Sequence, residues 1–169
     1  IYRRWWLYPK ISSYLQGDTL DIGCGIGDML RYRPEMTGVD VNPLTIDWLK
    51  SQGMKTYVMQ PDLLPFEDNS FDSILMDNVL EHISSPAAIL AEVRRVLRSQ
   101  GKLVVGVPGL RGYASDPDHK IYYDKEKLVR CFISAEFRPF KFFYSPFKFH
   151  WFDKHLRQYC TFGVFEVFK

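Results

Sequence analysis

The sequence predicts an α/β fold with a doubly wound, mostly parallel β-sheet, and three observations support this prediction. Short apolar segments alternate with helix-length segments along the first two thirds of the 169 residues, which is the pattern of βαβ units. The apolar segment at residues 71–76 indicates a strand buried on both faces, as parallel sheets require. Three alternating glycines, at positions 23, 25 and 27, follow the first apolar segment and predict a loop folded closely around a ligand.

Five strands and four helices are expected in order along this part of the chain. The strands are predicted at residues 19–22, 36–41, 55–58, 71–76 and 102–107. The helices between them are predicted at residues 28–32, 43–52, 78–83 and 86–97. Apolar residues recur at helical spacing in the helices 43–52 and 86–97, and we expect Gly53 and Gly101 to end these two helices. The crossovers between parallel strands should be right-handed.

The two ends of the chain depart from this alternation. Residues 2–15 combine aromatic, basic and apolar side chains, and they predict helical pieces, interrupted at Pro9, that lead into the first strand. A helix is expected at residues 125–132, and the aromatic-rich residues 137–147 and 159–168 are typical of strands. We expect these two late strands to pair as an antiparallel edge, so that the sheet has seven strands.

The composition is that of a globular protein and argues against several classes of partner. Apolar residues make up 46% and charged residues 25%, with a formal net charge of +2, whereas nucleic-acid binding favours a concentrated basic surface. No apolar run approaches the roughly 18 residues of a membrane span, and no signal peptide is visible. The three cysteines, Cys24, Cys131 and Cys160, lie far apart and lack metal-site spacing. We therefore expect a cytoplasmic protein that binds neither nucleic acid nor a metal.

Two kinds of cofactor could bind the glycine loop. A dinucleotide-binding fold has the pattern G-x-G-x-x-G, with the pyrophosphate at the N-terminus of the following helix. In this chain the third glycine comes one position early, and Asp28 stands where a pyrophosphate would approach. We therefore favour a nucleotide-like cofactor without phosphates, and a dinucleotide-dependent oxidoreductase is the alternative.

Five blocks of sequence, in order, carry a family pattern. They are LDIGCGIG at residues 20–27, GVDVN at 38–42, DLLPFEDNSFD at 62–72, NVLEHI at 78–83 and LRSQGKL at 97–103. Together these blocks resemble the class I S-adenosylmethionine-dependent methyltransferases of type 11. The resemblance implies a Rossmann-like methyltransferase fold with an antiparallel C-terminal strand, and S-adenosylmethionine as the cofactor. The length, and a sequence with no internal repeat or linker, predict one domain over residues 1–169, with a helical lead-in at 1–17, a cofactor-binding half at 18–108 and a substrate-side half at 109–169.

The resemblance assigns ten residues to the cofactor. They are Asp21, Gly23, Cys24, Gly25, Gly27, Asp40, Val41, Asp62, Leu63 and Asn78. The glycines would bring the backbone close to the methionine moiety, and Asp21 would orient the loop or meet the ammonium group. Asp40 would accept hydrogen bonds from both ribose hydroxyls, or else cap the following helix. Asp62 would accept from the adenine amine, with the N–H of Leu63 beside it, or else be a turn residue. Cys24 could instead be a small apolar filler.

Methyl transfer from a sulfonium is an in-line displacement that depends on positioning and on the exclusion of water. A hydroxyl acceptor also benefits from a general base, and His82 and His119 are the candidates. His82 could instead pack or cap within a short helix.

The polar segment after the fifth strand supplies the candidate contacts to a small-molecule acceptor. They are Asp116, His119, Tyr122 and Tyr123. Family members with similar stretches act on sugars and cell-envelope intermediates, which implies transfer to oxygen on such an acceptor. Asp116, Pro117 and Asp118 could equally build a hydrogen-bonded turn. Asp116, Asp118 and His119 form one short cluster without a distant partner, so we predict no metal there.

Two further possibilities remain open. The aromatic-rich C-terminal segment, where Lys141, Lys148 and Lys154 lie among phenylalanines, could contact a partner or a membrane surface, although strand packing explains most of it. The chain could also be a non-catalytic subunit that binds S-adenosylmethionine as a regulator or scaffold.

Overall fold

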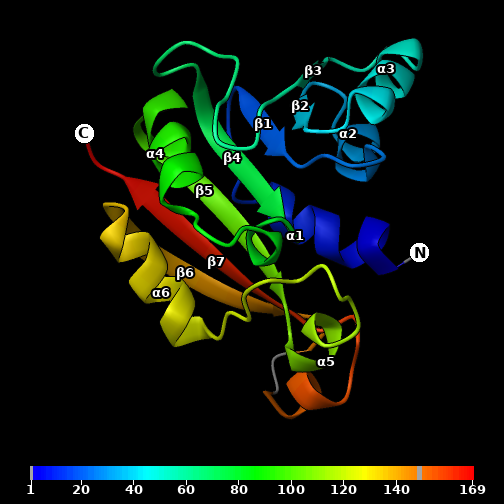
Figure 1. Cartoon of the computed structure of the whole chain (residues 1–169), viewed down its shortest axis with the longest axis vertical. Coiled ribbons are helices and arrows are strands. Elements are labelled where there is room, and N and C mark those ends of the chain that lie inside the picture. Colours follow the sequence, from blue (N-terminus) through cyan, green and yellow to red (C-terminus); the bar gives the residue numbers. More distant parts are fainter. Residues whose placement is uncertain (1, 148–149) are drawn as a thin grey trace.

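A seven-stranded β-sheet runs through the molecule in the order β3-β2-β1-β4-β5-β7-β6 (Figure 1). The structure is a computed structural model that describes residues 2–147 and 150–169. The strands are β1 (Thr19–Ile22), β2 (Thr37–Asp40), β3 (Thr56–Val58), β4 (Phe71–Asp77), β5 (Leu97–Pro108), β6 (Phe137–Ser145) and β7 (Cys160–Val167). Neighbouring strands are parallel except where β7 pairs antiparallel with β5 and with β6. The predicted doubly wound fold with an antiparallel C-terminal strand is confirmed.

Helices cover both faces of the sheet (Figure 1). The helices α1 (Tyr8–Ser12), α2 (Asp28–Tyr32) and α3 (Pro43–Ser51) contribute to the core on one face. The helices α4 (Ala87–Val96) and α6 (Lys125–Ser134) contribute to the core on the other face. A short helix, α5 (Leu110–Tyr113), follows β5 within the segment that the sequence predicted as a loop.

Strand β4 explains why residues 71–76 are so apolar. Ile74 and Met76 belong to the core under α4 and α6, whereas Leu75, between them, belongs to the core under α1, α2 and α3. All three side chains are at most 1% exposed. Successive residues of a strand point to opposite faces, so a strand covered on both sides needs apolar residues at consecutive positions.

Three expected elements differ from the structure. Helix α4 ends at Val96, and the expectation that Gly101 ends it is wrong, because the fully buried Leu97 already pairs with Phe71 across the sheet. Residues 78–83 form only a 3₁₀ turn, Leu80–His82. Pro9 lies near the start of α1 and does not interrupt the helical segment. This segment begins with a π-helical turn at Arg3–Leu7.

The aromatic residues of the C-terminal segment serve mainly to pack the last strands. Phe143 stacks on Phe162 with ring centroids 4.8 Å apart, and Phe142 contacts the ring of Phe165. Phe147 remains half exposed, and Lys148 lies outside the described residues. Contact of this segment with a partner or a membrane surface stays a prediction. Within the described parts of the chain, no helix is long and apolar enough to cross a membrane.

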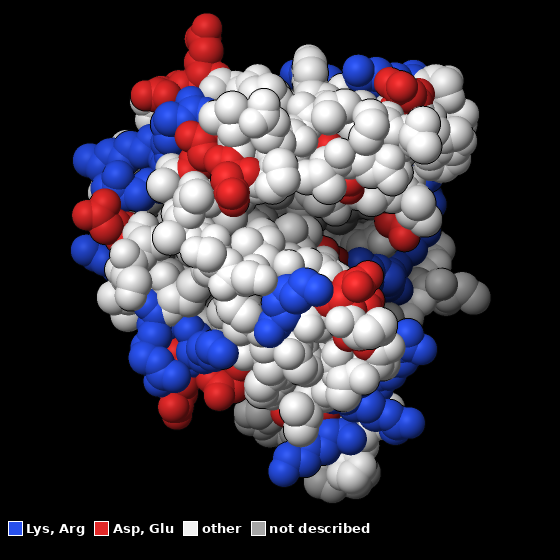
Figure 2. Space-filling model, in the orientation of Figure 1, with Lys and Arg blue, Asp and Glu red and all other residues white. Residues whose placement is uncertain are grey.

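Charged side chains of both signs share the surface. Figure 2 shows Lys and Arg intermingled with Asp and Glu around the edges of one face, with a broad uncharged area between them. This face therefore does not form a single basic field of the kind that favours nucleic acid.

We expect Ile74→Ala to lower the free energy of unfolding by about 2–5 kcal/mol, because it leaves a cavity in a fully buried strand. Ile133→Ala is the matched control, since Ile133 is 55% exposed and its truncation should cost less than about 1 kcal/mol. Urea denaturation followed by circular dichroism measures both values. Equal losses in the two variants would contradict the placement of β4 at the centre of the core.

Candidate functional site

Three cavities adjoin one another at the carboxyl ends of β1, β2 and β4, where open α/β sheets bind ligands. The loop cavity, of about 240 Å³, is lined by the glycine loop and Asp21. The hydrophobic cavity, of about 320 Å³, lies beside Asp40 and Met59. The large cavity, of about 810 Å³, lies between the N-terminal segment and the segment that contains His119. Gly23 lines the first two cavities, and Asn78 lines the second and third.

The glycine loop has a backbone that only glycine adopts easily. Gly23, Gly25 and Gly27 have φ angles of 69°, 49° and 77°, in the left-handed region. A Cβ atom at Gly23 would come within 2.4 Å of Val79, whereas one at Gly25 would meet nothing within 4 Å. Gly25 therefore leaves open space beside the backbone at the wall of the loop cavity, where a ligand can approach closely.

Asp40 holds this loop from the end of β2. One carboxylate oxygen accepts a hydrogen bond from the Gly25 N–H at 3.0 Å, and the other accepts from the Asn42 N–H at 2.9 Å. Asn42, not Asp40, caps α3 by accepting from Leu44 and Thr45, so the capping alternative for Asp40 is wrong. A carboxylate can accept about four hydrogen bonds, so Asp40 keeps acceptor capacity toward the hydrophobic cavity that it lines.

Carboxylates outnumber cations around the loop cavity. Asp21, Asp28 and Asp77 all line it, together with Arg3. Burial, with a smaller effect of the Asp77 and Asp40 carboxylates, raises the pKa of Asp21 well above its ordinary value. Burial also raises the pKa of Asp77, against the opposing effect of Arg3, whose guanidinium donates to Asp77 at 2.6 Å. A ligand with positive charge would relieve the repulsion between the Asp21 and Asp77 carboxylates.

The hydrophobic cavity is formed largely by side chains that the sequence analysis did not single out. Its apolar lining comes from Ile22, Val41, Met59, Pro61, Val79, Ile83 and Ile89. Asp62 and Leu63 are exposed and do not line it, and the Leu63 N–H donates to the Gln60 carbonyl in a local turn. Met59 and Pro61 line it instead, and their position just after β3 was the available signal.

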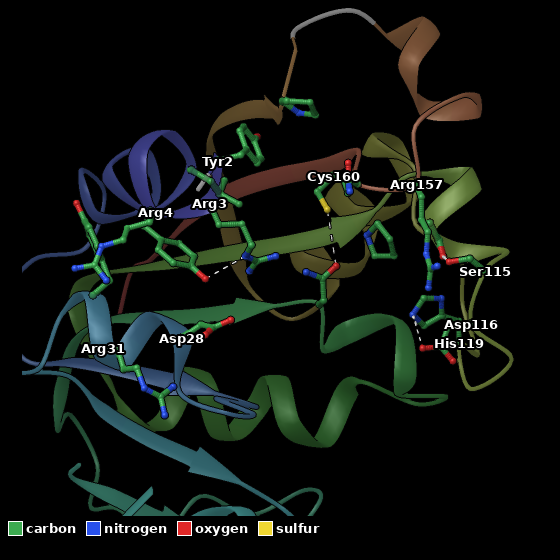
Figure 3. A pocket seen from close by; sticks show the side chains of 18 residues that line it. Tyr2, Arg3, Arg4, Asp28, Arg31, Ser115, Asp116, His119, Arg157 and Cys160 are labelled. Carbon is green, nitrogen blue, oxygen red and sulfur yellow. Dashed lines mark hydrogen bonds and ion pairs between the residues drawn. The ribbon is translucent and has the colours of Figure 1, made fainter. Parts of the chain in front are cut away.

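The large cavity carries four arginines, Arg3, Arg4, Arg31 and Arg157. Figure 3 shows Arg3, Arg4 and Arg31 on one side of it and Arg157 on the other, beside His119. The first three come from the N-terminal segment and α2, and Arg157 precedes β7, so only the tertiary fold brings them together. No local motif could have predicted this set.

The two candidate histidines lie in contact but line different cavities. His119 lines the large cavity and His82 the hydrophobic cavity, and their ring centroids are 4.7 Å apart. His119 Nδ1 donates to the Tyr113 carbonyl at 2.8 Å, so in the neutral ring Nε2 carries a lone pair. That atom lies 3.8 Å from a carboxylate oxygen of Glu81, whose pKa is raised to about 8 by burial.

Of the other expected acceptor contacts, Asp116 lines the large cavity and the two tyrosines do not. Asp116 lines the large cavity, and it also accepts from the Asp118 N–H in the turn proposed as its alternative role. Tyr122 donates to Asp153 at 3.1 Å, and the buried Tyr123 belongs to the hydrophobic core. Neither tyrosine lines the large cavity.

The expected cofactor residues fall into two groups. Those that line the loop cavity or the hydrophobic cavity are Asp21, Gly23, Cys24, Gly25, Asp40, Val41 and Asn78. Gly27, Asp62 and Leu63 line neither cavity. Gly27 precedes α2, and a Cβ atom there would come within 2.6 Å of Leu49. The Cys24 side chain is buried in the core formed with α1, α2 and α3.

The doubly wound sheet, with a glycine loop after β1 and an acid at the end of β2, defines a Rossmann-like fold. Residues 20–105 match the methyltransferase domain family of type 11, and the chain belongs to this family of S-adenosylmethionine-dependent methyltransferases. This assignment leaves no support for the dinucleotide-dependent alternative.

Known proteins resemble the chain in sequence and in structure. A protein of Mycobacterium tuberculosis, named a probable S-adenosylmethionine-dependent methyltransferase, is 30% identical over 149 residues, which cover 81% of this chain and 53% of that protein. The ubiquinone/menaquinone biosynthesis C-methyltransferase UbiE of Desulfotalea psychrophila is 31% identical over 114 residues, covering 60% and 46%. The solved structure of a methyltransferase from Methanosarcina mazei is 22% identical and has a TM-score of 0.74, covering 95% of this chain and 98% of that one. The chain spans about half the length of the curated relatives it matches.

We expect Cys24 to resist alkylation in the folded protein. Burial raises the pKa of this thiol to about 12, so very little of the reactive thiolate exists at pH 8. Iodoacetamide labelling at pH 8, followed by mass spectrometry, should modify Cys24 at least ~100-fold more slowly in the native chain than in urea. Comparable rates in both states would mean that Cys24 faces the cofactor space rather than the core.

Proposed function

We propose that the chain transfers a methyl group from S-adenosylmethionine to an oxygen atom of a small anionic acceptor in the large cavity. The adjacency of the three cavities carries this proposal. Gly23 lines both smaller cavities, and Asn78 lines the hydrophobic cavity and the large cavity. A cofactor that fills the first two cavities would therefore lie directly beside an acceptor in the third.

The lining of the two smaller cavities fits S-adenosylmethionine from end to end. The carboxylates of Asp21, Asp28 and Asp77 suit its ammonium and sulfonium charges, and the open backbone at Gly25 admits the methionine moiety. Asp40 retains acceptor capacity for the ribose hydroxyls. The apolar walls around Met59 suit the adenine ring. When bound, the cofactor supplies an electrophilic methyl group on sulfur.

The charge of the large cavity suggests the chemistry of the acceptor. Four arginines against Asp28 and Asp116 favour a carboxylate or a phosphate, since a guanidinium binds both groups in a bidentate manner. A cavity of about 810 Å³ accommodates a molecule of the size of a phosphorylated sugar. These features support a sugar or cell-envelope precursor as the acceptor.

His119 is the group that we assign to the acceptor proton. Its Nδ1 is engaged with the Tyr113 carbonyl, and its Nε2 keeps a lone pair beside Asp116. A hydroxyl in the large cavity could pass its proton to that nitrogen as its oxygen attacks the methyl carbon. His82 lines the hydrophobic cavity, so we assign it no contact with the acceptor hydroxyl.

Calorimetry and a turnover assay test the proposal together. S-adenosylmethionine should bind with one site per chain, and NAD should not bind. Release of S-adenosylhomocysteine is then measured with phosphorylated sugars, with neutral sugars and with quinol-type carbon acceptors. Turnover only with carbon acceptors would overturn the oxygen assignment. Binding without turnover on any acceptor would favour the scaffold alternative, and binding of NAD alone would overturn the proposal entirely.

We expect Asp40→Asn to weaken binding of S-adenosylmethionine by roughly 10- to 100-fold, the effect of losing a charged hydrogen-bonding partner. An amide has only one oxygen, so it cannot hold the Gly25 and Asn42 N–H groups and the ribose at once. Asp47→Asn, on the exposed face of α3, is the control and should leave the affinity within about twofold. Calorimetric titration gives both dissociation constants; similar affinities in the two variants would remove Asp40 from the cofactor site.

We expect Arg157→Met to raise the KM of an anionic acceptor by about 10-fold or more while kcat changes little, because its charge binds substrate and transition state alike. Arg130→Met is the control, since Arg130 is an exposed residue of α6 that does not line the large cavity. Steady-state kinetics with saturating cofactor separate the two constants. An unchanged KM for Arg157→Met would exclude this arginine from acceptor binding.

A further inference from the structure

We propose that Glu81, His82 and His119 form a binding site for a divalent transition-metal ion at the wall of the large cavity. The three residues each offer one ligand atom, and these atoms lie within 4.8 Å of one another. Two imidazoles and one carboxylate are a ligand set found in zinc and iron sites. The sequence predicted no metal at His119, because the neighbouring acidic residues formed one short cluster without a distant partner. The fold supplies that partner from the turn after β4.

Glu81 is the strongest indication that a cation belongs here. Its side chain is 1% exposed, and both carboxylate oxygens lack a hydrogen-bond partner among the described residues. A buried carboxyl group without partners is costly in any protein, and nearly all such groups are paired. A metal ion between Glu81 and the two imidazoles would satisfy these oxygens.

His119 is held in the orientation of a metal ligand. Its Nδ1–H donates to the Tyr113 carbonyl at 2.8 Å, and its ring stacks on the Tyr113 ring at 5.4 Å. Metal-ligating histidines almost always donate their other ring N–H to a carbonyl or a carboxylate, which fixes the ring and directs the lone pair at the ion. Here that arrangement directs Nε2 toward Glu81, at 3.8 Å, and toward Asp116, at 3.9 Å.

The backbone keeps the two halves of the cluster together. The N–H groups of Lys120 and Ile121 donate to the Glu81 carbonyl at 2.7 and 3.1 Å, so the loop that contains His119 is fastened to the turn that contains Glu81 and His82. Ligand atoms around a tetrahedral zinc ion lie roughly 3.4 Å apart, given bonds of about 2.1 Å. Small side-chain movements therefore suffice to close the site, and Asp116 or water can complete the coordination.

The position of the site links it to catalysis, a step that rests on the proposed function. His119 and Asp116 both line the large cavity, so an acceptor hydroxyl there could coordinate the ion and lose its proton to solvent more easily. The new O–CH3 bond would form as the S–CH3 bond breaks, and the electron pair of that bond would remain on sulfur. With the ion bound, His119 acts as a ligand and the ion activates the hydroxyl; the role of His119 as proton acceptor applies to the metal-free protein.

Metal binding is tested on the tag-free chain after removal of bound metal with a chelator, using Zn²⁺ or Mn²⁺ alone. Calorimetry should show one ion per chain, and a concentration of about 100 times Kd should raise the melting temperature by roughly 5–10 °C. Glu81→Gln and His119→Ala should each weaken binding at least ~10-fold, the effect expected for loss of a ligand. Glu126→Gln, an exposed residue of α6, is the control and should bind as the unaltered chain does.

The melting temperature of the metal-free Glu81→Gln protein distinguishes loss of metal binding from misfolding. Because the carboxyl oxygens of Glu81 have no hydrogen-bond partner among the described residues, Glu81→Gln should leave the melting temperature of the metal-free protein nearly unchanged and lower only the rise caused by the ion. Absence of stoichiometric binding, or equal binding in the ligand variants and the control, would overturn the proposal. These measurements need neither cofactor nor acceptor, so failure of methyl transfer would leave their outcome untouched.

Discussion

The hydrogen bonds of the Asp40 carboxylate hold the ligand-binding edge of this molecule together. Asp40 ends β2, and its two oxygens bind the backbone of the glycine loop after β1 and the backbone that leads into α3. One side chain thus fixes two neighbouring connections of the sheet relative to each other. This anchor, the β1–β2 pairing and the hydrogen bonds from the Gly23 and Cys24 N–H groups to the Val39 carbonyl hold the left-handed glycines in place.

A second constraint comes from the N-terminal segment, which crosses the same edge of the sheet. Arg3 donates to Asp77 at the end of β4 and to the hydroxyl of Tyr8, and it lines both the loop cavity and the large cavity. The segment before the first strand therefore lines the candidate site and also covers the core. Arg3 therefore contacts the acid beside the proposed cofactor site and also lines the cavity proposed for the acceptor.

Local patterns predicted the sheet well, because a strand covered on both faces, such as β4, has apolar residues at consecutive positions. They also placed Asp40 and the glycine loop, whose roles depend on the conformation of a few neighbouring residues. They failed where contacts between distant residues determine the structure. Leu97, which was expected in a helix, pairs with Phe71 in the sheet, and Tyr123, which was expected at the acceptor, lies in the core. The four arginines of the large cavity come together only in the folded chain. The same is true of Glu81 and His119, so no spacing in the sequence could reveal either set.

The place of β7 in the sheet has a consequence for synthesis on the ribosome. Lys102 of β5 pairs with Glu166, and Arg138 of β6 pairs with the same residue from the other side. The newest strand thus inserts between two older ones, so β5 keeps an open edge and β6 has no partner until residues 160–167 have emerged. Pairing at such sequence separations is entropically costly and slow. The nascent chain therefore exposes hydrophobic strand edges until β7 has emerged, and chaperones that bind such edges would find their target in that interval.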